Sequence, residues 1–212
     1  MNITEYIKNN LQGFSIRKPA YGQLEYSLRF QLGPDEPSPY DHVTEICNEG
    51  YFEEVFNRAT TIFEAVFEKE DNVIVIYQEF AWKKHRIRRY NYFFKQFQEF
   101  SWGDIRFKKV HQVYGVDHAD KWNRAIFEIK AKHINYQNII RGISNQDFWI
   151  RKPSVDGEVL LINTDKNIIY HMYDDRGLDV ISSEKKAVQP IYEKYKNWIL
   201  DYNREEINEI FK

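Results

Sequence analysis

Residues 159–181 read VLLINTDKNIIYHMYDDRGLDVI, and this stretch decides the fold class. Two apolar runs, at residues 159–162 and 168–173, are separated by a short polar segment, which is typical of a β-hairpin. A second polar turn, at residues 174–177, leads into another apolar run at residues 178–181. The stretch therefore predicts a three-stranded meander in the C-terminal third of the chain.

Three more segments have the patterns of strands. Residues 26–32 alternate large apolar with polar side chains, which is the period of a half-buried strand. Residues 73–77 are continuous and β-branched, as expected for a central strand covered on both faces. Residues 124–132 alternate again. These segments and the meander predict a mixed or antiparallel sheet.

Apolar residues recur at three- and four-residue spacing in the segments that we predict as helices. These are residues 3–11, 52–67, 90–97, 136–143 and 191–202. Pro190 is compatible with the last helix only in its first turn, and residues 33–41, with three prolines, are predicted as an extended loop. We expect an α+β fold in which helices flank the sheet, with residues 1–212 forming a single domain.

The composition excludes several classes of protein. The aromatic share of 17% supplies a large core, so the chain is not expected to be disordered. Cys47 is the one cysteine, which excludes an intrachain disulfide and a cysteine-based zinc site and suits a reducing compartment. No apolar run approaches the roughly 18 residues of a membrane span, and residues 1–8 do not resemble a signal peptide. We expect a cytoplasmic protein with no membrane association.

The charge is near neutral overall, with a formal value of −2, but its distribution is uneven. Residues 35–71 are strongly acidic, with Arg58 and Lys69 as the basic exceptions, whereas residues 82–95 carry basic side chains and no acid. The simplest interpretation is that the two segments partly neutralise each other in the fold.

The turn at residues 174–177 is the first candidate site. Adjacent carboxylates beside an arginine and a histidine have the donor types that hold a divalent metal or a phosphate. The residues of this candidate catalytic set are His171, Asp174, Asp175, Arg176 and Asp179. The favoured interpretation is structural, because aspartate at the start of a turn and glycine at its end satisfy turn geometry, although Arg176 is not explained in this way.

The basic segment is the second candidate site, since cations interleaved with rings can hold phosphates while a ring stacks on a base. The residues of this candidate binding set are Trp82, Lys83, Lys84, Arg86, Arg88, Arg89 and Tyr90. The slightly acidic chain argues against nucleic acid, and a solvated helix face is the alternative. His111 and His118 with nearby aspartates form a weak set without a known ligand motif, so we assign no metal and no cofactor.

Several motifs resemble one uncharacterised bacterial family, domain of unknown function family 3885. They are YDDRGLDV (173–180), YEKY (192–195), WILDYNR (198–204), LRFQLG (28–33), RATTIF (58–63) and QDF (146–148). The resemblance spans most of the chain and implies a single bacterial domain. It carries no activity, substrate or catalytic residues.

The leading hypothesis is a non-catalytic protein-binding module, because tyrosine and tryptophan dominate interface hot spots and the chain is rich in rings. An immunity protein that neutralises a cognate toxin is the most concrete role of this kind. Two alternatives stay open: a metal-dependent phosphoester hydrolase that uses the turn at residues 174–177, and nucleic-acid binding through residues 83–95. The partner is expected to be another protein, and the oligomeric state stays open.

Overall fold

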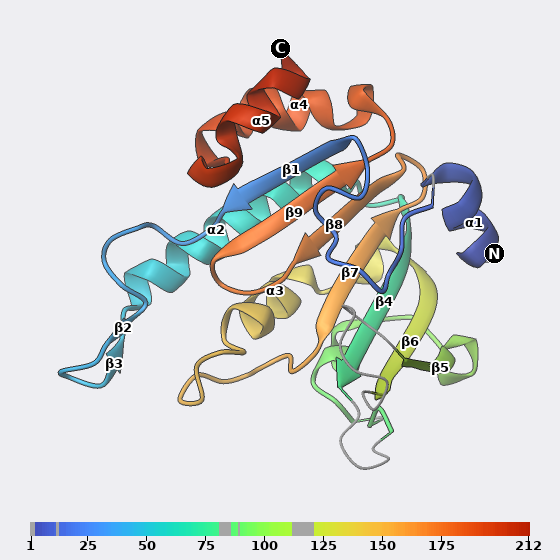
Figure 1. The fold of residues 1–212 in the computed structure, drawn as a ribbon. Helices are drawn as coiled ribbons and strands as arrows, with labels where there is room; N and C mark the ends of the chain where they lie inside the picture. The colour runs from blue at the N-terminus through green and yellow to red at the C-terminus, as the bar shows by residue number, and fades with distance from the viewer. Residues whose placement is uncertain (1–2, 12, 81–85, 89, 112–120) are drawn as a thin grey trace.

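The computed structural model of the 212-residue chain describes residues 3–11, 13–80, 86–88, 90–111 and 121–212 (Figure 1). Its centre is a seven-stranded sheet in the order β1-β9-β8-β7-β4-β6-β5, in which all pairs of neighbours are antiparallel. The strands are β1 (Tyr26–Gln31), β4 (Asn72–Phe80), β5 (Arg106–His111), β6 (Lys121–Lys130), β7 (Glu158–Asn163), β8 (Ile168–Met172) and β9 (Gly177–Ser182). The predicted α+β class is confirmed.

The predicted meander is formed by β7, β8 and β9. Its first turn is stabilised locally, because the Oδ1 atom of Asn163 accepts hydrogen bonds from the backbone amides of Asp165 and Lys166, each 3.1 Å long. Asn167 then takes a left-handed conformation, with φ of 55°, which asparagine tolerates better than most residues. Side-chain hydrogen bonding thus closes the hairpin that the polar segment predicted.

The predicted central position of β4 is also correct. Val73 and Val75 face one apolar cluster and Ile74 and Ile76 face the other, and all four are buried. A strand with apolar residues on both faces fits only the interior of a covered sheet.

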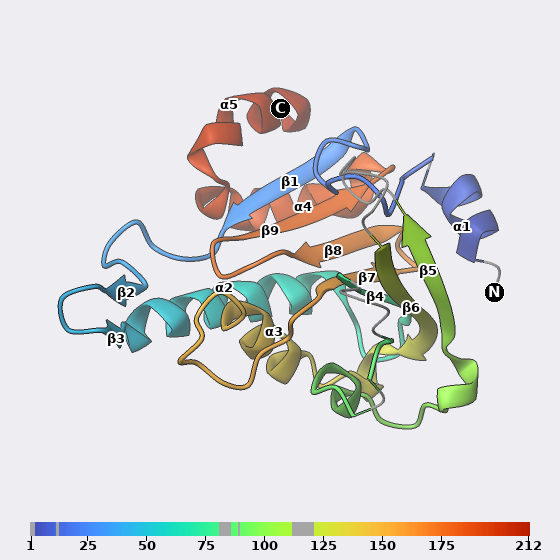
Figure 2. The ribbon, with the colours of Figure 1, turned by 60° about the horizontal axis from the view of Figure 1, so that its bottom comes forward.

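The larger core lies between one face of the sheet and four helices, α2 (Glu49–Val66), α3 (Tyr136–Ser144), α4 (Lys185–Tyr195) and α5 (Asp201–Phe211) (Figure 2). The long helix α2 begins at Asn48, whose Oδ1 atom accepts from the amides of Gly50 and Tyr51. The smaller core on the other face is closed by α1 (Ile3–Asn10) and the segment that follows it, with Leu11 fully buried. None of the described helices is long and apolar enough to cross a membrane.

Two predicted helices are wrong in extent. Residues 90–97 hold only a short 3₁₀ turn (Phe93–Gln96), because Phe97 leaves it to pair with Ile134 beside the core. Residues 191–202 are divided between α4 and α5, and Pro190 lies inside α4, which starts at Lys185. The two helices separate where Ile199 pairs with Phe30 at the outer edge of β1.

Two strand regions were not predicted. The loop at residues 33–41 ends in a small hairpin of β2 (Tyr40–Asp41) and β3 (Ile46–Cys47), which projects from the body of the molecule beside the start of α2 (Figure 1). β5, at the edge of the sheet, lies in a region whose structure the sequence left open.

Candidate functional site

The structure divides the predicted catalytic set into two groups. His171 on β8 and Asp179 on β9 are register partners, and both lie on the sheet face opposite α2. Asp174, Asp175 and Arg176 form the turn between these strands. The turn and the sheet face are therefore separate sites.

On the sheet face, His171 and Asp179 belong to a row of polar side chains that crosses six neighbouring strands. The Arg29 guanidinium donates two hydrogen bonds to Asp179, of 2.8 and 3.0 Å. The His171 Nε2 atom lies 3.1 Å from a carboxylate oxygen of Glu158, and the side-chain amide of Gln78 donates to the other oxygen. In strand order the row is Arg29, Asp179, His171, Glu158, Gln78 and Arg124. We call it the polar row.

The polar row is largely buried, and its charges alternate from Arg29 to Glu158. Burial alone would lower the pKa of His171, but the carboxylates of Asp179 and Glu158 outweigh it and raise that pKa to about 9. The imidazole is therefore protonated at neutral pH and lies between two carboxylates. A protonated ring has no free lone pair with which to accept a further proton.

A cavity of about 520 Å³ lies over the polar row. The Arg29 guanidinium lies 4.3 Å from the ring centroid of Tyr21 and 5.5 Å from that of Tyr173. Its charge is already paired with Asp179. The Arg29–Asp179 pair is thus satisfied, whereas the His171 ring lies between two carboxylates without a well-aligned hydrogen bond.

The β8–β9 turn is likewise satisfied by its own residues. Asp174 accepts from the backbone amide of Arg176 at 2.8 Å and from the guanidinium of the same residue, so Arg176 is anchored while 74% of its side chain is exposed. Asp175 is buried and accepts from the Tyr51 hydroxyl at 2.8 Å. Burial raises the pKa of Asp175 above its usual range, although the hydrogen bond from Tyr51 opposes this.

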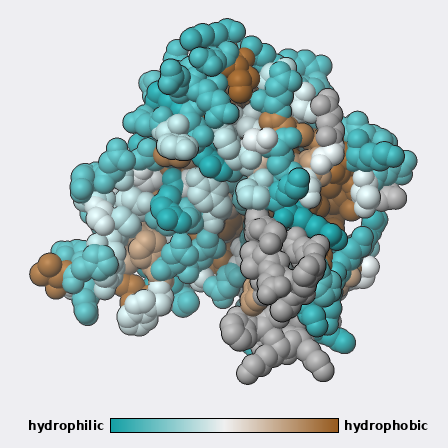
Figure 3. Space-filling view, viewed as in Figure 1, coloured by the Kyte–Doolittle hydropathy of each residue, from teal (hydrophilic) through white to brown (hydrophobic). Residues whose placement is uncertain are grey.

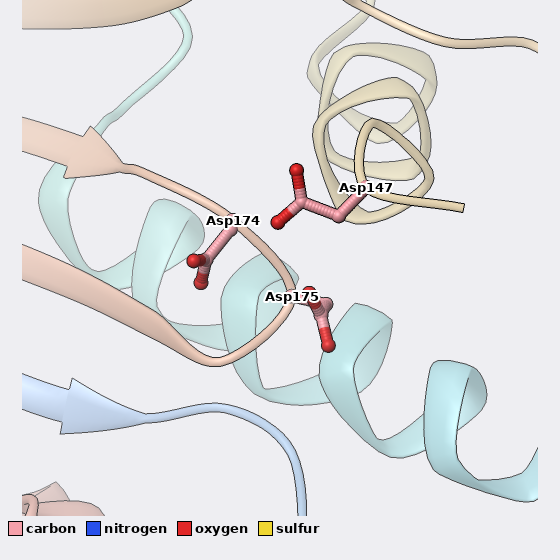
Figure 4. Close-up of side chains that lie close together, drawn as sticks. All are labelled: Asp147, Asp174 and Asp175. Atoms are coloured by element: carbon pink, nitrogen blue, oxygen red, sulfur yellow. The ribbon is translucent and has the colours of Figure 1, made fainter. Parts of the chain in front are cut away.

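Asp147, which follows α3, brings a third carboxylate to the turn (Figure 4). One oxygen atom from each of Asp147, Asp174 and Asp175 lies within 4.8 Å of the others. Two of these carboxylates are already used by Arg176 and Tyr51. The hydrolase hypothesis stays a prediction, and the geometry of the turn is accounted for by its internal bonds.

The turn forms the base of an acidic surface at the end of the molecule where α2 begins. We call this surface the acidic end and define it by residues 35–49, 147–151 and 174–176. Its acidic side chains at the surface are Asp35, Glu36, Asp41, Glu45, Glu49 and Asp147, and the buried Asp174 and Asp175 lie beneath them in the turn. Arg151 and Arg176 are its basic exceptions, and each is paired with one of these acids.

Four large apolar side chains are exposed on the acidic end. Val43 and Ile46, on the β2–β3 hairpin, are 92% and 63% exposed, and Trp149 and Ile150 are 83% and 41% exposed. Figure 3 shows the apolar tip of the hairpin standing out from a hydrophilic surface. Exposed large apolar side chains with polar neighbours are typical of protein-binding surfaces.

The segment that carries Trp149 is held firmly on α2. The Arg151 guanidinium bonds to Glu49 at 2.5 and 3.2 Å and to Asn145 at 2.8 Å, and it lies 3.7 Å from the ring centroid of Phe52. Phe148 packs edge-on against the same ring. Trp149 and Ile150 are thus fixed between two anchored residues.

The basic segment is only partly described. Trp82, Lys83, Lys84 and Arg89 lie outside the described residues, whereas Arg86, Arg88 and Tyr90 are exposed. Within the described part of the chain, the ion pairs of acidic residues 35–71 are made with Arg58, Lys132, Arg151 and Lys166. The expected neutralisation between the acidic and basic segments stays a prediction, because Lys83, Lys84 and Arg89 lie outside the described residues.

Comparison with known proteins places the chain in a family. The family model described as "Domain of unknown function (DUF3885)" matches residues 3–203. The chain belongs to this family. It is also 26% identical over 215 residues to the "Uncharacterized protein YnaE" of Bacillus subtilis (strain 168), which covers 95% of this chain and 99% of that protein. No solved structure matches.

In this DUF3885 member, sequence reasoning found two of the six residues of the polar row. Arg29 and Glu158 could have been noticed as single charged residues inside or beside otherwise apolar strands. Gln78 and Arg124 carry no such signal, because their contact depends on the pairing of β4 with β6. Val43 and Trp149 were not singled out because isolated apolar residues in loops are common.

Proposed function

We propose that the protein is a non-catalytic binding module that holds a basic protein partner against its acidic end. The observation that carries the proposal is the exposure of Val43, Ile46, Trp149 and Ile150 on one acidic surface. A monomer gains no stability from such exposure, whereas an interface buries these side chains and draws affinity from them. An immunity protein that blocks a basic toxin is one role of this kind.

The chemistry of the acidic end favours a protein over a small molecule. Its apolar side chains stand on a projecting hairpin and a surface loop, whereas small ligands are bound in concave sites that surround them. Arg176 adds an anchored but exposed guanidinium, and arginine is frequent among hot-spot residues. The carboxylates around the apolar centre would steer a basic partner to it.

The test is affinity purification of the tagged protein from its native cell, followed by measurement of the affinity for the recovered partner. We expect the variant Val43→Ser, Trp149→Ser to lose at least about ten-fold in affinity, because each large apolar side chain at an interface centre contributes roughly 1 to 4 kcal/mol. We also expect the association rate to fall as salt is added.

Tyr202→Ser is the matched control, since Tyr202 on α5 is 92% exposed but lies outside the acidic end. It should leave the affinity unchanged. A partner that binds both variants equally, or recovery of no partner at all, would contradict the proposal.

A further inference from the structure

A second cavity, of about 410 Å³, lies at the opposite edge of the sheet, beside β5. Its lining is basic and aromatic, and no acid is among the described residues that form it. The lining residues are Arg86, Ile87, Trp102, Phe107, Lys108, Lys109, Asn123 and Arg124. We call it the β5 cavity.

Three cations of the β5 cavity have no counter-charge among the residues that the structure describes. Arg86, Lys108 and Lys109 take part in none of the ion pairs of that part of the chain, whereas Lys132, Lys166 and Arg151 each pair with a carboxylate elsewhere in the molecule. Lys109 lies on the sheet face of Phe107, whereas Lys108, the register partner of Arg124, points to the other face. Like charges that line one hollow repel one another unless an anion joins them. The cavity is therefore electrostatically suited to an anionic group such as a phosphate.

The same cavity contains an aromatic platform. The ring of Phe107 is parallel to that of Trp102, at 6° and with centroids 6.1 Å apart, and 49% of the Phe107 residue is exposed. Trp102 is in turn packed against the buried Phe94, with centroids 4.9 Å apart. A flat, supported and partly open ring is the feature on which nucleobases stack.

Arg86 also lines a neighbouring cavity of about 870 Å³, together with Arg88 and the exposed Tyr90. Glu79 and Asp156 line that cavity as well, so its charge is mixed and the anion-binding chemistry is confined to the β5 cavity.

We propose that the β5 cavity binds a phosphorylated nucleoside, with the phosphate held by Arg86 and Lys109 and the base stacked on Phe107. The ligand is a free nucleotide or a unit of a single strand, which share this chemistry. The β5 cavity shares no residue with the acidic end, so a test of this site does not depend on the proposed protein partner.

The test is fluorescence anisotropy of the full chain with a labelled ten-nucleotide single-stranded DNA at several salt concentrations, with AMP and inorganic phosphate as competitors. We expect Arg86→Gln, Lys109→Gln to weaken binding at least ten-fold at low salt. The slope of log affinity against log salt should become shallower by about 0.7 for each phosphate that the variant no longer binds. Phe107→Leu should weaken binding about five-fold or more, because the base then has no ring on which to stack.

Lys194→Gln, Lys196→Gln is the control, because it removes the same charge from α4 and the 3₁₀ turn after it, at the other edge of the sheet. Its affinity should match that of the wild type. Tighter binding of the strand than of AMP would assign the site to single strands, and equal binding would assign it to free nucleotides.

Three results would overturn the proposal. The first is the absence of binding to either probe. The second is equal loss in the control and in the Arg86, Lys109 variant. The third is competition by inorganic phosphate as strong as that by AMP, together with no effect of Phe107→Leu, which would leave the base without a role. Circular dichroism of each variant verifies that it is folded.

Discussion

His171 gives the stability of the protein a defined dependence on pH. Its pKa is about 9 in the folded protein and 6.5 in the unfolded chain, so its stabilising contribution is fully present below pH 6.5 and is lost as the pH rises towards 9. This pKa shift corresponds to a contribution of about 3 kcal/mol to the free energy of unfolding. Urea unfolding at pH 6.5 and pH 9 should show a larger loss of stability for the wild type than for His171→Gln. An identical loss in both proteins would mean that His171 is not held protonated by its neighbours.

Gly157 is required by a close approach rather than by its backbone angles. A Cβ atom at this position would lie 2.4 Å from the Cε2 atom of Tyr77, whose fully buried ring stacks on Phe93 and cannot retreat. We expect Gly157→Ala to cost about 1 to 3 kcal/mol of unfolding free energy. At Gly103 the nearest atom to such a Cβ lies 3.5 Å away, so Gly103→Ala should change stability by less than about 0.5 kcal/mol. Thermal unfolding of the two variants measures the difference.

At the scale of elements, the N-terminus of α2 contributes both to the stability of the fold and to the structure of the acidic end. Asn48 caps the helix, and the turn that it starts presents Glu49 to Arg151 and Tyr51 to Asp175. Asn48→Ala should lower the unfolding free energy by about 1 kcal/mol, and Asn48→Ser should retain most of it. Chemical denaturation tests this order. Equal stability of the alanine and serine variants would show that the cap does not hold the helix.

The elements also show how far the sequence can be read. Strong periodicity located β1, β4, β6, the meander and α2, because their burial is set by local pattern. β5 reads RFKKVH, with two apolar residues that are not at strand spacing, and it exists because β6 pairs with it. The apolar residues within 90–97 have helical spacing. Instead of forming a helix, Phe93 packs on Tyr77 and Phe97 packs on Phe127 in the core. The polar row and the acidic end combine residues far apart in the sequence, and a local pattern cannot reveal such contacts.

At the scale of the whole molecule, the acidic end and the β5 cavity lie at well-separated places on the body (Figure 1). Separated sites without shared side chains are expected to act independently. The variant Val43→Ser, Trp149→Ser should therefore bind the labelled single strand within about two-fold of the wild type in the anisotropy assay. A larger change would indicate that the two surfaces are coupled through the sheet.

The sheet order also predicts how the molecule opens. β4, β7 and β8 lie inside the sheet and are buried, whereas β5 and the β2–β3 hairpin are peripheral and largely exposed. Amide hydrogen exchange measured by mass spectrometry should be slowest in the first group and fastest in the second. Fast exchange in β4 would contradict this core assignment.

The polar row has a consequence for how the strands find their places during folding. Side chains alternate between the faces of a strand, so a slip of one residue in β8 would turn His171 into the larger core. Glu158 would then lose its cation, and Asp179 would keep only its bonds to Arg29. A sheet face made only of valine and isoleucine would accept such a slip at far lower cost. A buried pair of charges stabilises a fold less than well-packed apolar side chains of similar size would. The polar row therefore favours one register across six strands at some cost in stability.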